Sequence, residues 1–491
     1  MTFYSISGAT QSVAIRGINE AKHSVNDSME KLSTGIRINS GADNPADLAK
    51  ISRLTAQIQS TSQAVRNVNE ALSDLEIADV ALEEISDMLV RMKEITVEAS
   101  SEALSITDRT TLTDEFGFLK QEVESLARNT KSNGSHLLDG SFSGRTYQVG
   151  PNGASTITAS IPGATPTSLG SYSSTGPTRD ALAAAQTATA NTTTGSEDIV
   201  LTANGNTTTI DVGANDSAKT VAGKINALSN ETGISAEAST FAYLFSTNAS
   251  SANYTIKIND TSTSSFAISS SDATDAVSKI NLISATTGVS ASATSDGKVL
   301  LHDADGDDIT IENANSGTDL DVQALQNDGT TTQGSAISLA AGASTNNDAT
   351  RVIGTLKLDS SQGFSISQSG NSSLGYTTSG TPSLSSLNAV DLSSATKAAN
   401  SSAILSGASE QIATIRGNLG ATESRLNYAG SFLEEFKSSL SQAQGKIRDT
   451  DFAVESARLA KAMVLQKTST ALLSQANASQ SLVLNLLKEA S

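Results

Sequence analysis

The side chains best suited to bind a metal ion lie in one short acidic run, DADGDD at positions 303–308. Carboxylates at alternate positions resemble the ligands of a calcium loop. An EF-hand, however, would need Gly where Asp308 stands and Glu where Ala314 stands. We therefore interpret the run as a turn.

The histidines and the absence of cysteine argue against catalysis. His23, His136 and His302 are far apart in the sequence, and none belongs to a His-Glu-x-x-His zinc motif. The chain has no Cys, which excludes a thiol nucleophile, a disulfide framework and a Cys-zinc site. It also lacks the Gly-x-Ser-x-Gly and phosphate-loop patterns. We expect a protein that is not an enzyme and has no metal or other cofactor.

Charge and hydropathy narrow the possible partners. The 491 residues include 51 acidic and 32 basic side chains, for a net charge of −19. An acidic chain repels phosphate backbones, so we expect no nucleic-acid partner. No stretch of 18 apolar residues occurs, and residues 1–11 lack the basic and apolar segments of a signal peptide. We therefore expect no membrane-spanning segment. If the chain is exported, we expect a route that does not use a signal peptide.

The middle of the chain differs in composition from both ends. Residues 164–390 carry 21 acidic and 8 basic side chains and are dominated by Ser, Thr, Asn, Gly and Ala. Four of the six prolines lie between 151 and 177, so both ends are almost free of helix-breaking Pro. These features predict two helix-rich ends around an acidic, polar insertion.

The C-terminal end has the most regular apolar pattern. Steps of three and four residues connect one continuous stripe over six heptads, as expected for a helix that packs along a partner helix. A long core helix of a globular protein would show the same pattern. The stripe consists of Leu405, Ala408, Ile412, Ile415, Leu419, Thr422, Leu426, Ala429, Leu433, Phe436, Leu440, Ala443 and Ile447.

The N-terminal end contains the expected partner helices. Asn44 can cap a helix that begins at Pro45, and we expect its stripe to slip near Ala78 and then resume. A second helix should end near Asn133-Gly134. The first stripe is Ile51, Leu54, Ile58, Thr61, Val65, Val68, Leu72, Leu75, Leu82, Ile85, Leu89 and Met92, and the second is Leu112, Phe116, Leu119, Val123 and Leu126.

The extreme termini have weaker stripes. Since ordering the backbone costs about 1–2 kcal/mol per residue, we expect these segments to become ordered against copies of themselves. The first stripe ends at Gly35. The residues are Ala14, Ile18, Ala21, Val25, Ser28 and Leu32 at one end and Leu459, Met463, Leu472, Leu473, Ala476, Val483 and Leu486 at the other.

Several motifs resemble those of bacterial flagellins, over residues 1–163 and 385–491. The N-terminal motifs are LSTGIRINS at 32–40, ADNPADLA at 42–49, LVRMKEI at 89–95 and YQVG at 147–150. The C-terminal motifs are LGATESRL at 419–426, IRDTDFA at 447–453 and LSQAN at 473–477. They occur in the family's order, and the chain is identified as a member of that family.

The resemblance implies a subunit of the flagellar filament, the propeller for swimming. Such a subunit is exported unfolded through the flagellar type III channel with an export chaperone and polymerises outside the cell, next to cap and junction proteins. The implied fold is mainly α, with long paired coiled-coil-like helices from both ends and an inserted α+β or β-rich outer region. Residues 1–44 and 450–491 would form inner-tube helices, 45–163 and 391–449 a helical core with a β-hairpin region, and 164–390 a variable outer region.

The implied packing residues lie on the two long stripes, and three others align with a host contact. The host innate flagellin receptor binds some family members at positions that match Arg91, Ile95 and Glu115. These three could equally belong to a solvated helix face that becomes buried between subunits. The expected subunit-packing residues are Leu54, Ile58, Val65, Val68, Leu72, Ile412, Ile415, Leu419, Leu426, Leu433, Phe436, Leu440 and Ile447.

The middle contains an internal repeat with an offset of 55 residues. KIN at 224–226 and GISA at 233–236 recur as KIN at 279–281 and GVSA at 288–291. Each copy follows a β-like run, which predicts two α+β units of strands, a short helix ending near Gly, and further strands, at about 198–250 and 253–313. Two alternatives to a filament subunit stay open: a hook-filament junction protein, and a secreted coiled-coil adhesin whose function lies in the middle region.

Overall fold

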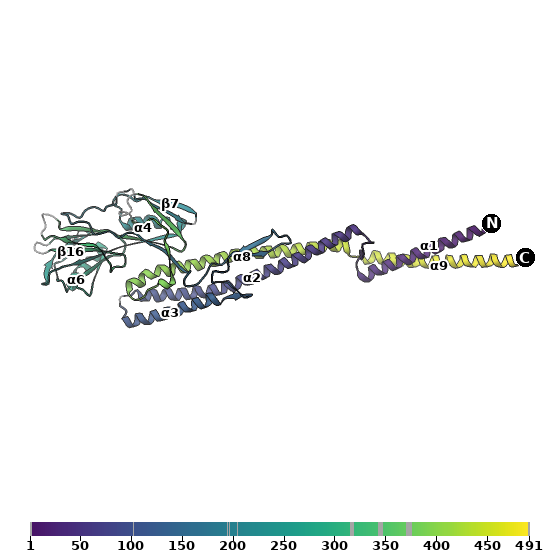
Figure 1. Cartoon of the computed structure of the whole chain (residues 1–491), viewed down its shortest axis with the longest axis horizontal. Coiled ribbons are helices and arrows are strands. Elements are labelled where there is room, and N and C mark those ends of the chain that lie inside the picture. The colour runs from purple at the N-terminus through teal and green to yellow at the C-terminus, as the bar shows by residue number, and fades with distance from the viewer. Residues whose placement is uncertain are drawn as a thin grey trace. The chain divides into compact units, whose positions relative to one another are not determined.

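The computed structural model has helical ends and a β-rich middle (Figure 1). It describes residues 2–101, 103–193, 195, 197–203, 205–314, 319–341, 347–369 and 376–489. The coarse expectation of helix-rich ends around an inserted β-rich region is confirmed. The main helices are α1 (Thr2–Thr34), α2 (Pro45–Ala99), α3 (Ile106–Asn129), α8 (Ala395–Arg448) and α9 (Phe452–Glu489).

The chain divides into two compact units that cut across α2 and α8. Unit 1 comprises 1–73, 145–159 and 422–491, and unit 2 comprises 74–144 and 160–421. The boundaries of these units fall within α2 and α8, because residues 74–99 and 395–421 are grouped with the β-rich region.

Local signals set the helix ends. The Asp47 amide donates to Asn44 Oδ1 at 3.1 Å, so the predicted cap of α2 is confirmed. Gly35, at φ +72°, follows the last residue of α1. The predicted end of α3 was wrong: the helix stops at Asn129, and Asn133-Gly134 instead form the left-handed turn of a hairpin between β1 (Lys131–Ser132) and β2 (Ser135–His136). An Asn-Gly pair suits both structures, and the turn prevailed here.

In unit 1, α1 and α9 lie side by side (Figure 1). The predicted α1 stripe is confirmed, with every one of its members buried or half-buried. In α9 the residues that are buried or half-buried at this spacing are Glu455, Leu459, Ala462, Gln466, Ser469, Leu473 and Ala476. Met463 and Leu472, predicted for this stripe, are exposed because small or polar residues occupy the contact positions. The side chains of Val483 and Leu486 lie outside the described residues.

The buried rows of α2 and α8 follow the predicted spacing, with local differences. In α2 the row runs without interruption through Thr61, Ala64, Val68, Ala71, Leu75, Ala78, Leu82, Ile85, Leu89, Met92, Thr96 and Ala99. The expected slip near Ala78 was wrong, because two successive steps of three already occur at Ile58, Thr61 and Ala64. In α8 the predicted row is buried or half-buried except at Ala443, where the neighbouring Gln444 is buried and donates to Thr55 Oγ1 at 2.6 Å.

Unit 1 also contains a hairpin, and unit 2 contains most of the strands. The largest sheet of unit 2 has the order β13-β14-β8-β19-β5-β21, with β16 pairing β8 and β17 pairing β16. The strands of the two units are β3 (Arg145–Gln148), β4 (Thr156–Ala159), β5 (Gly170–Thr175), β6 (Ile199–Ala203), β7 (Asn206–Ile210), β8 (Ile234–Phe245), β9 (Ala252–Tyr254), β10 (Ile256–Ile258), β11 (Thr261–Ser262), β12 (Phe266–Ile268), β13 (Val289–Ala293), β14 (Val299–Asp303), β15 (Ile309–Asn313), β16 (Leu320–Leu325), β17 (Thr332–Leu339), β18 (Ala349–Val352), β19 (Thr355–Ser360), β20 (Phe364–Gln368) and β21 (Ser383–Ser386).

The internal repeat is visible in the hydrogen bonds. Short helices α4 (Ala218–Asn226) and α5 (Ser229–Thr232) correspond to α6 (Thr274–Asn281) and α7 (Ser284–Thr287), and a 3-10 turn η1 (Leu387–Ala389) precedes α8. Asn226 exchanges two 2.8 Å hydrogen bonds with the Ala236 backbone, and Asn281 does the same with Ala291. Both α5 and α7 end at a glycine in the left-handed region.

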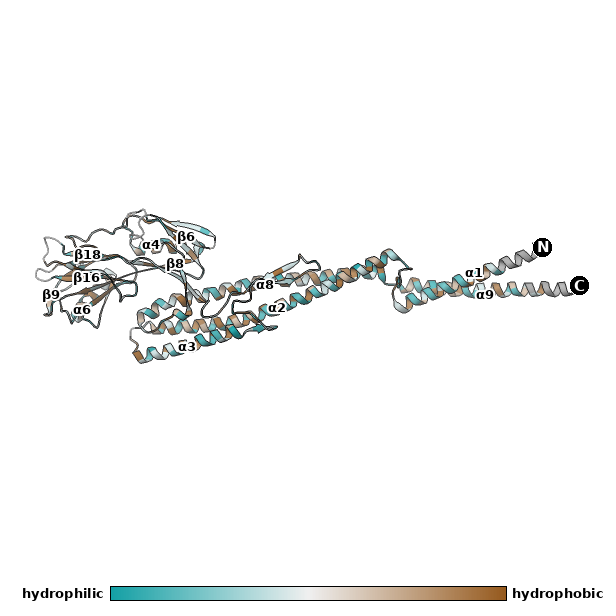
Figure 2. Ribbon diagram, viewed as in Figure 1, coloured by the Kyte–Doolittle hydropathy of each residue, from teal (hydrophilic) through white to brown (hydrophobic). Residues whose placement is uncertain are grey.

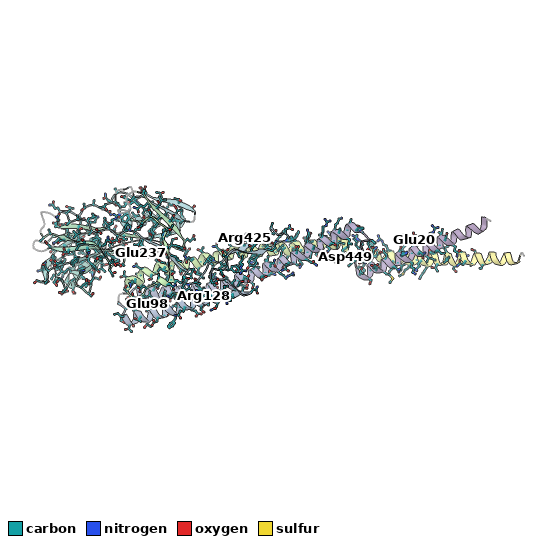
Figure 3. All side chains as sticks on the ribbon, viewed as in Figure 1. Glu20, Glu98, Arg128, Glu237, Arg425 and Asp449 are labelled. Carbon is teal, nitrogen blue, oxygen red and sulfur yellow. The ribbon has the colours of Figure 1, made fainter. Side chains whose placement is uncertain are left out.

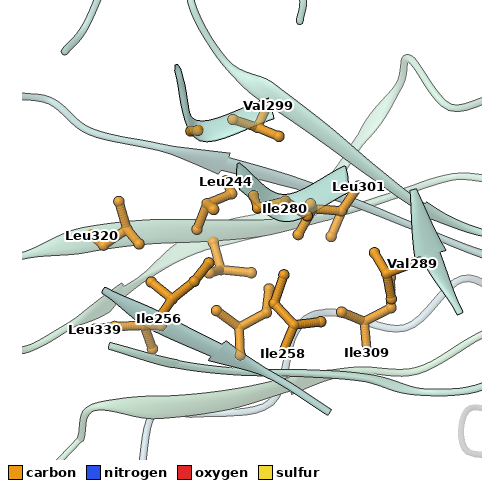
Figure 4. Close-up of a cluster of buried hydrophobic side chains, with 14 of the residues drawn as sticks. Leu244, Ile256, Ile258, Ile280, Val289, Val299, Leu301, Ile309, Leu320 and Leu339 are labelled. Carbon is orange, nitrogen blue, oxygen red and sulfur yellow. The ribbon is translucent and has the colours of Figure 1, made fainter. Parts of the chain in front are cut away.

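Two apolar cores lie under the large sheet, and strand β8 contributes to both. Ile234, Ala236 and Ala238 belong to the first core, whereas Ala242 and Leu244 belong to the second, which Figure 4 shows. The two repeats are therefore joined by a continuous strand, which their sequence boundaries did not indicate. In the described part of the chain, no helix is both long and apolar enough to cross a membrane.

Candidate functional site

Helices α1 and α9 bury small and polar side chains against each other. Ala14, Ala21 and Ala462 are buried, and Ser28 donates to Glu455 Oε1 at 2.6 Å. A Cβ added to Gly17 would lie 3.1 Å from Ser469 Oγ, so the two helices approach closely there. Since such residues remove little apolar surface from water, this pairing gains little hydrophobic free energy.

Many of the large apolar side chains of these helices are exposed instead. Figure 2 shows hydrophobic and hydrophilic residues interspersed along both helices. Leu472 is 59% exposed and Val13 is 61% exposed. Exposed apolar surface of this extent on a helix pair indicates a surface that another protein covers. The exposed members are Val13, Ile15, Met29, Phe452, Val454, Met463, Val464, Leu465, Leu472 and Leu482.

A groove of about 590 Å³ runs between α1 and α9 and carries both signs of charge. Asp27 and Glu20 of α1 line it, as do Arg458 and Lys461 of α9, and Figure 3 labels Glu20. Glu455 is buried and pairs with Arg458 at 3.4 Å. The groove therefore offers apolar contact and charge pairing to a helical partner.

The long helices also expose apolar side chains. On α8, Tyr428 is 79% exposed, and Phe432 stacks with Phe436 at a centroid distance of 5.9 Å. On α3, Phe118 is 70% exposed. Tyr428, Phe432 and Phe118 lie outside the predicted stripes and were missed from sequence, whereas Phe436 belongs to the predicted α8 stripe. The signal that could have identified them is a large aromatic residue at a heptad position outside the apolar stripe.

Six of the thirteen predicted subunit-packing residues lie in the chain's own interior. Val68, Ile412, Ile415, Leu419, Leu426 and Leu433 are buried, whereas Leu54, Ile58, Val65, Leu72, Phe436, Leu440 and Ile447 are half-buried. Only the second group keeps surface that another subunit could cover.

Arg91 and Glu115 are brought together, but Ile95 is not exposed with them. Arg91 Nη2 lies 2.7 Å from Glu115 Oε1, and hydrogen bonds to Glu115 and then to Glu94 raise the pKa of Arg91. Ile95 is fully buried, so its side chain does not reach the surface that this ion pair forms.

The segment that follows α1 is hydrogen-bonded to the segment at the C-terminal end of α8. Ile36 and Asp449 form an antiparallel bridge, and the Arg37 amide donates to the Arg448 carbonyl oxygen at 2.7 Å. Arg37 Nη2 also donates to the Ile447 carbonyl at 2.6 Å and so caps the C-terminal end of α8. Sequence reasoning missed this role, because it depends on two segments about 410 residues apart.

The acidic run at 303–308 forms a turn. Asp303 Oδ1 accepts hydrogen bonds from the amides of Asp305, Gly306 and Asp307. Lys219 pairs with Asp307 and Asp305, and these contacts raise its pKa. Over the ranges that the structure describes, no group of three or more His, Asp or Glu side chains is arranged to hold a metal ion.

Comparison with known proteins identifies a family to which this chain is similar. Sequence profiles described as the bacterial flagellin N-terminal and C-terminal helical regions match residues 7–143 and 402–487. B-type flagellin of Pseudomonas aeruginosa is 30% identical over 96% of this chain and 97% of its own length.

Two solved structures are also similar in part. FliC from Burkholderia pseudomallei is 27% identical over 31% of this chain and 64% of its own, with a TM-score of 0.22. Flagellar hook-associated protein 3 from Legionella pneumophila is 14% identical over 81% of this chain and 98% of its own, with a TM-score of 0.35.

Proposed function

Because this chain belongs to the bacterial flagellin family and is a structural subunit of the flagellar filament, we propose that it polymerises through helices α1 and α9. The observation that carries this proposal is the outward orientation of their large apolar side chains. A helix pair that buries Ala14, Ala21 and Ser28 but exposes Val464 and Leu472 gains most of its hydrophobic stabilisation from a partner.

The terminal segments, 1–44 and 450–491, form the inner tube of the filament. Their groove presents Arg458 and Lys461 next to Glu20 and Asp27, so neighbouring copies can pair charges while covering apolar surface. Identical copies related by a helical operation form a filament when the contacts are head-to-tail and do not close into a ring.

Helices α2 and α8 form the coiled-coil-like core of each subunit, within 45–163 and 391–449. The buried row of α8 and the uninterrupted row of α2 support this pairing, as does Arg416 Nε, which bonds Asp79 Oδ1 at 2.8 Å. The half-buried Phe436, Leu440 and Ile447, together with Leu54, Ile58, Val65 and Leu72, then take part in subunit packing.

The region 164–390 projects outward and does not drive assembly. Its chain enters through β5 and leaves through β21, which pair antiparallel with Gly170 opposite Ser386 and Ser173 opposite Ser383. An insertion whose ends are neighbours can be replaced at little cost in loop closure. Its net charge of −13 keeps filaments soluble and apart.

The protein acts outside the cell, in the extracellular filament. We propose export through the flagellar type III apparatus with an export chaperone, contacts with cap and junction proteins at the filament ends, and recognition by the host innate receptor at Arg91 and Glu115. Ile95 takes part only if the packing around α2 opens.

The test is an internal deletion of 176–382 that joins Thr175 to Ser383 through a Gly-Asn-Gly linker and retains the β5–β21 pair. We expect it to form long, thinner filaments in seeded assembly observed by electron microscopy. The control lacks 452–491 and should not polymerise. Growth of the control without growth of the internal deletion would contradict the proposal, and capped stubs from the full chain would favour a junction protein.

A further inference from the structure

Strand β8 carries large aromatic side chains on the face opposite the apolar cores. The core side of β8 presents small residues such as Ala236, Ala238 and Ala242, whereas Phe241, Tyr243 and Phe245 point to the other side and are half-buried. A sheet normally has its larger apolar residues toward the core. Packing of the cores therefore does not explain these three rings.

The neighbouring strand β14 extends the same surface. His302 lies opposite Phe241, and their rings stack at a centroid distance of 4.2 Å and an interplanar angle of 2°. Leu300 lies opposite Tyr243. We call Phe241, Tyr243, Phe245, Leu300 and His302 the aromatic face. Four other aromatic residues of the same region, Tyr254, Phe266, Phe364 and Tyr376, are buried in the cores.

Polar side chains border the aromatic face: the amide of Gln323 can donate and accept hydrogen bonds, and the carboxylate of Asp321 can accept them. On β16, Gln323 lies opposite Tyr243 and Asp321 opposite Phe245. Burial, and then the nearby carboxylates of Asp296 and Asp328, raise the pKa of Tyr243. The ammonium group of Lys298 lies 5.1 Å from the ring centroids of Tyr243 and Phe245, and a second lysine, Lys357 of β19, lies opposite Glu237.

A cleft of about 360 Å³ opens at the Phe241 end of this face. Its lining combines the two stacked rings with a carboxylate, amides and hydroxyls, the mixture of apolar surface and a few polar groups that is typical of a small-molecule site. The two rings belong to Phe241 and His302, and the polar lining includes Glu237, Ser239, Asn327 and Ser290.

We propose that the aromatic face and its cleft bind a neutral oligosaccharide. A pyranose ring has an apolar C–H face, whose hydrogens are attracted to the negative face of an aromatic ring, and a rim of hydroxyls that donate and accept. Carboxylates and amides such as Asp321, Gln323 and Asn327 satisfy both roles of such hydroxyls. This activity goes beyond filament formation.

Charge decides between the possible occupants. The border of the face has four carboxylates, those of Glu237, Asp296, Asp321 and Asp328, against the two lysines Lys298 and Lys357, so an anionic glycan, a nucleic acid or an anionic membrane is repelled. A second copy of the region 164–390 would bring a net charge of −13 against another −13. A neutral oligosaccharide is repelled neither by the carboxylates at the border nor by the net charge of the region.

The experiment is saturation-transfer NMR on the full-length monomer and on filaments. The probes are N-acetyllactosamine and tetra-N-acetylchitotetraose, with sialylated N-acetyllactosamine as the anionic comparator. We expect saturation transfer to at least one neutral probe in both forms, and at least tenfold weaker binding of the sialylated probe. Absence of transfer to both neutral probes, or stronger binding of the sialylated one, would overturn the proposal.

Variants locate the site. Phe241→Val and Tyr243→Val keep a residue that favours strands but remove a ring, and each should weaken binding at least tenfold. Gln323→Leu keeps every ring and should weaken binding by removing hydrogen bonds. The matched control is Phe118→Val on α3, which removes an exposed ring elsewhere and should change nothing. Equal binding by all four variants, or retained binding by the 176–382 deletion, would contradict the assignment.

Discussion

Two neighbouring residues of α8 should separate the stability of the subunit from its assembly. Leu426 is fully buried in the row between Leu419 and Leu433, whereas Tyr428, two positions further, is 79% exposed. Both side chains are large and apolar, and both lie in the same compact unit. Replacing each by Ala therefore compares a residue that packs inside the chain with one that is available to a second copy.

The expected magnitudes differ between the two assays. Leu426→Ala removes buried methyl groups and leaves a cavity, which lowers the free energy of unfolding by about 2–5 kcal/mol. Tyr428→Ala should change that free energy by no more than about 0.5 kcal/mol, as for other exposed sites. If Tyr428 becomes buried between subunits, its loss costs about 1–2 kcal/mol of association free energy. That cost corresponds to a roughly tenfold higher critical concentration.

The monomer assay is urea unfolding followed by circular dichroism, and the assembly assay is sedimentation after seeded polymerisation. The reasoning would be refuted if Tyr428→Ala lowered the stability of the monomer as much as Leu426→Ala does. It would also be refuted if Tyr428→Ala left the critical concentration unchanged, because the exposed aromatic surface of α8 would then have no role in packing.

Three further results are expected. Burial raises the pKa of Tyr376 to about 12, so between pH 10 and 12 the folded protein keeps a proton that the unfolded chain loses. Its unfolding free energy should fall by about 2–3 kcal/mol over that range, and Tyr376→Phe should flatten this dependence in urea midpoints. Gly407→Ala would place a Cβ 2.7 Å from the Gly170 carbonyl oxygen and should lower the melting temperature through a cost of about 1–3 kcal/mol, whereas Gly417→Ala, with no atom within 4 Å of the added Cβ, should raise it slightly. Amides of α1 and α9 should exchange rapidly in dilute monomer and slowly in filaments, as measured by hydrogen exchange, and protection of both helices in the monomer would contradict the proposed assembly.

The sequence by itself determined the features that depend on local spacing. Heptad steps located the long helices and the contact row of α1, because a helix presents every third or fourth residue on one side. Asn44 and Gly35 marked two helix ends through their own backbone and side-chain chemistry. The repeated KIN and GISA motifs located the short helices of the middle region, because Asn226 and Asn281 bond residues only ten positions away.

The tertiary structure alone decided which members of a stripe are covered and by what. Small and polar residues, together with Leu459 and Leu473, form the contact row of α9, so Met463 and Leu472 face outward although their hydropathy predicted the opposite. Asn133-Gly134 became a hairpin turn because its strands pair with each other, and β8 joins two cores that appear separate in the sequence. Arg37 bonds the end of α8, and Phe241 stacks on His302, although the partners are far apart in the sequence. No local pattern predicts such contacts, because burial and ring stacking depend on which segments the fold brings together.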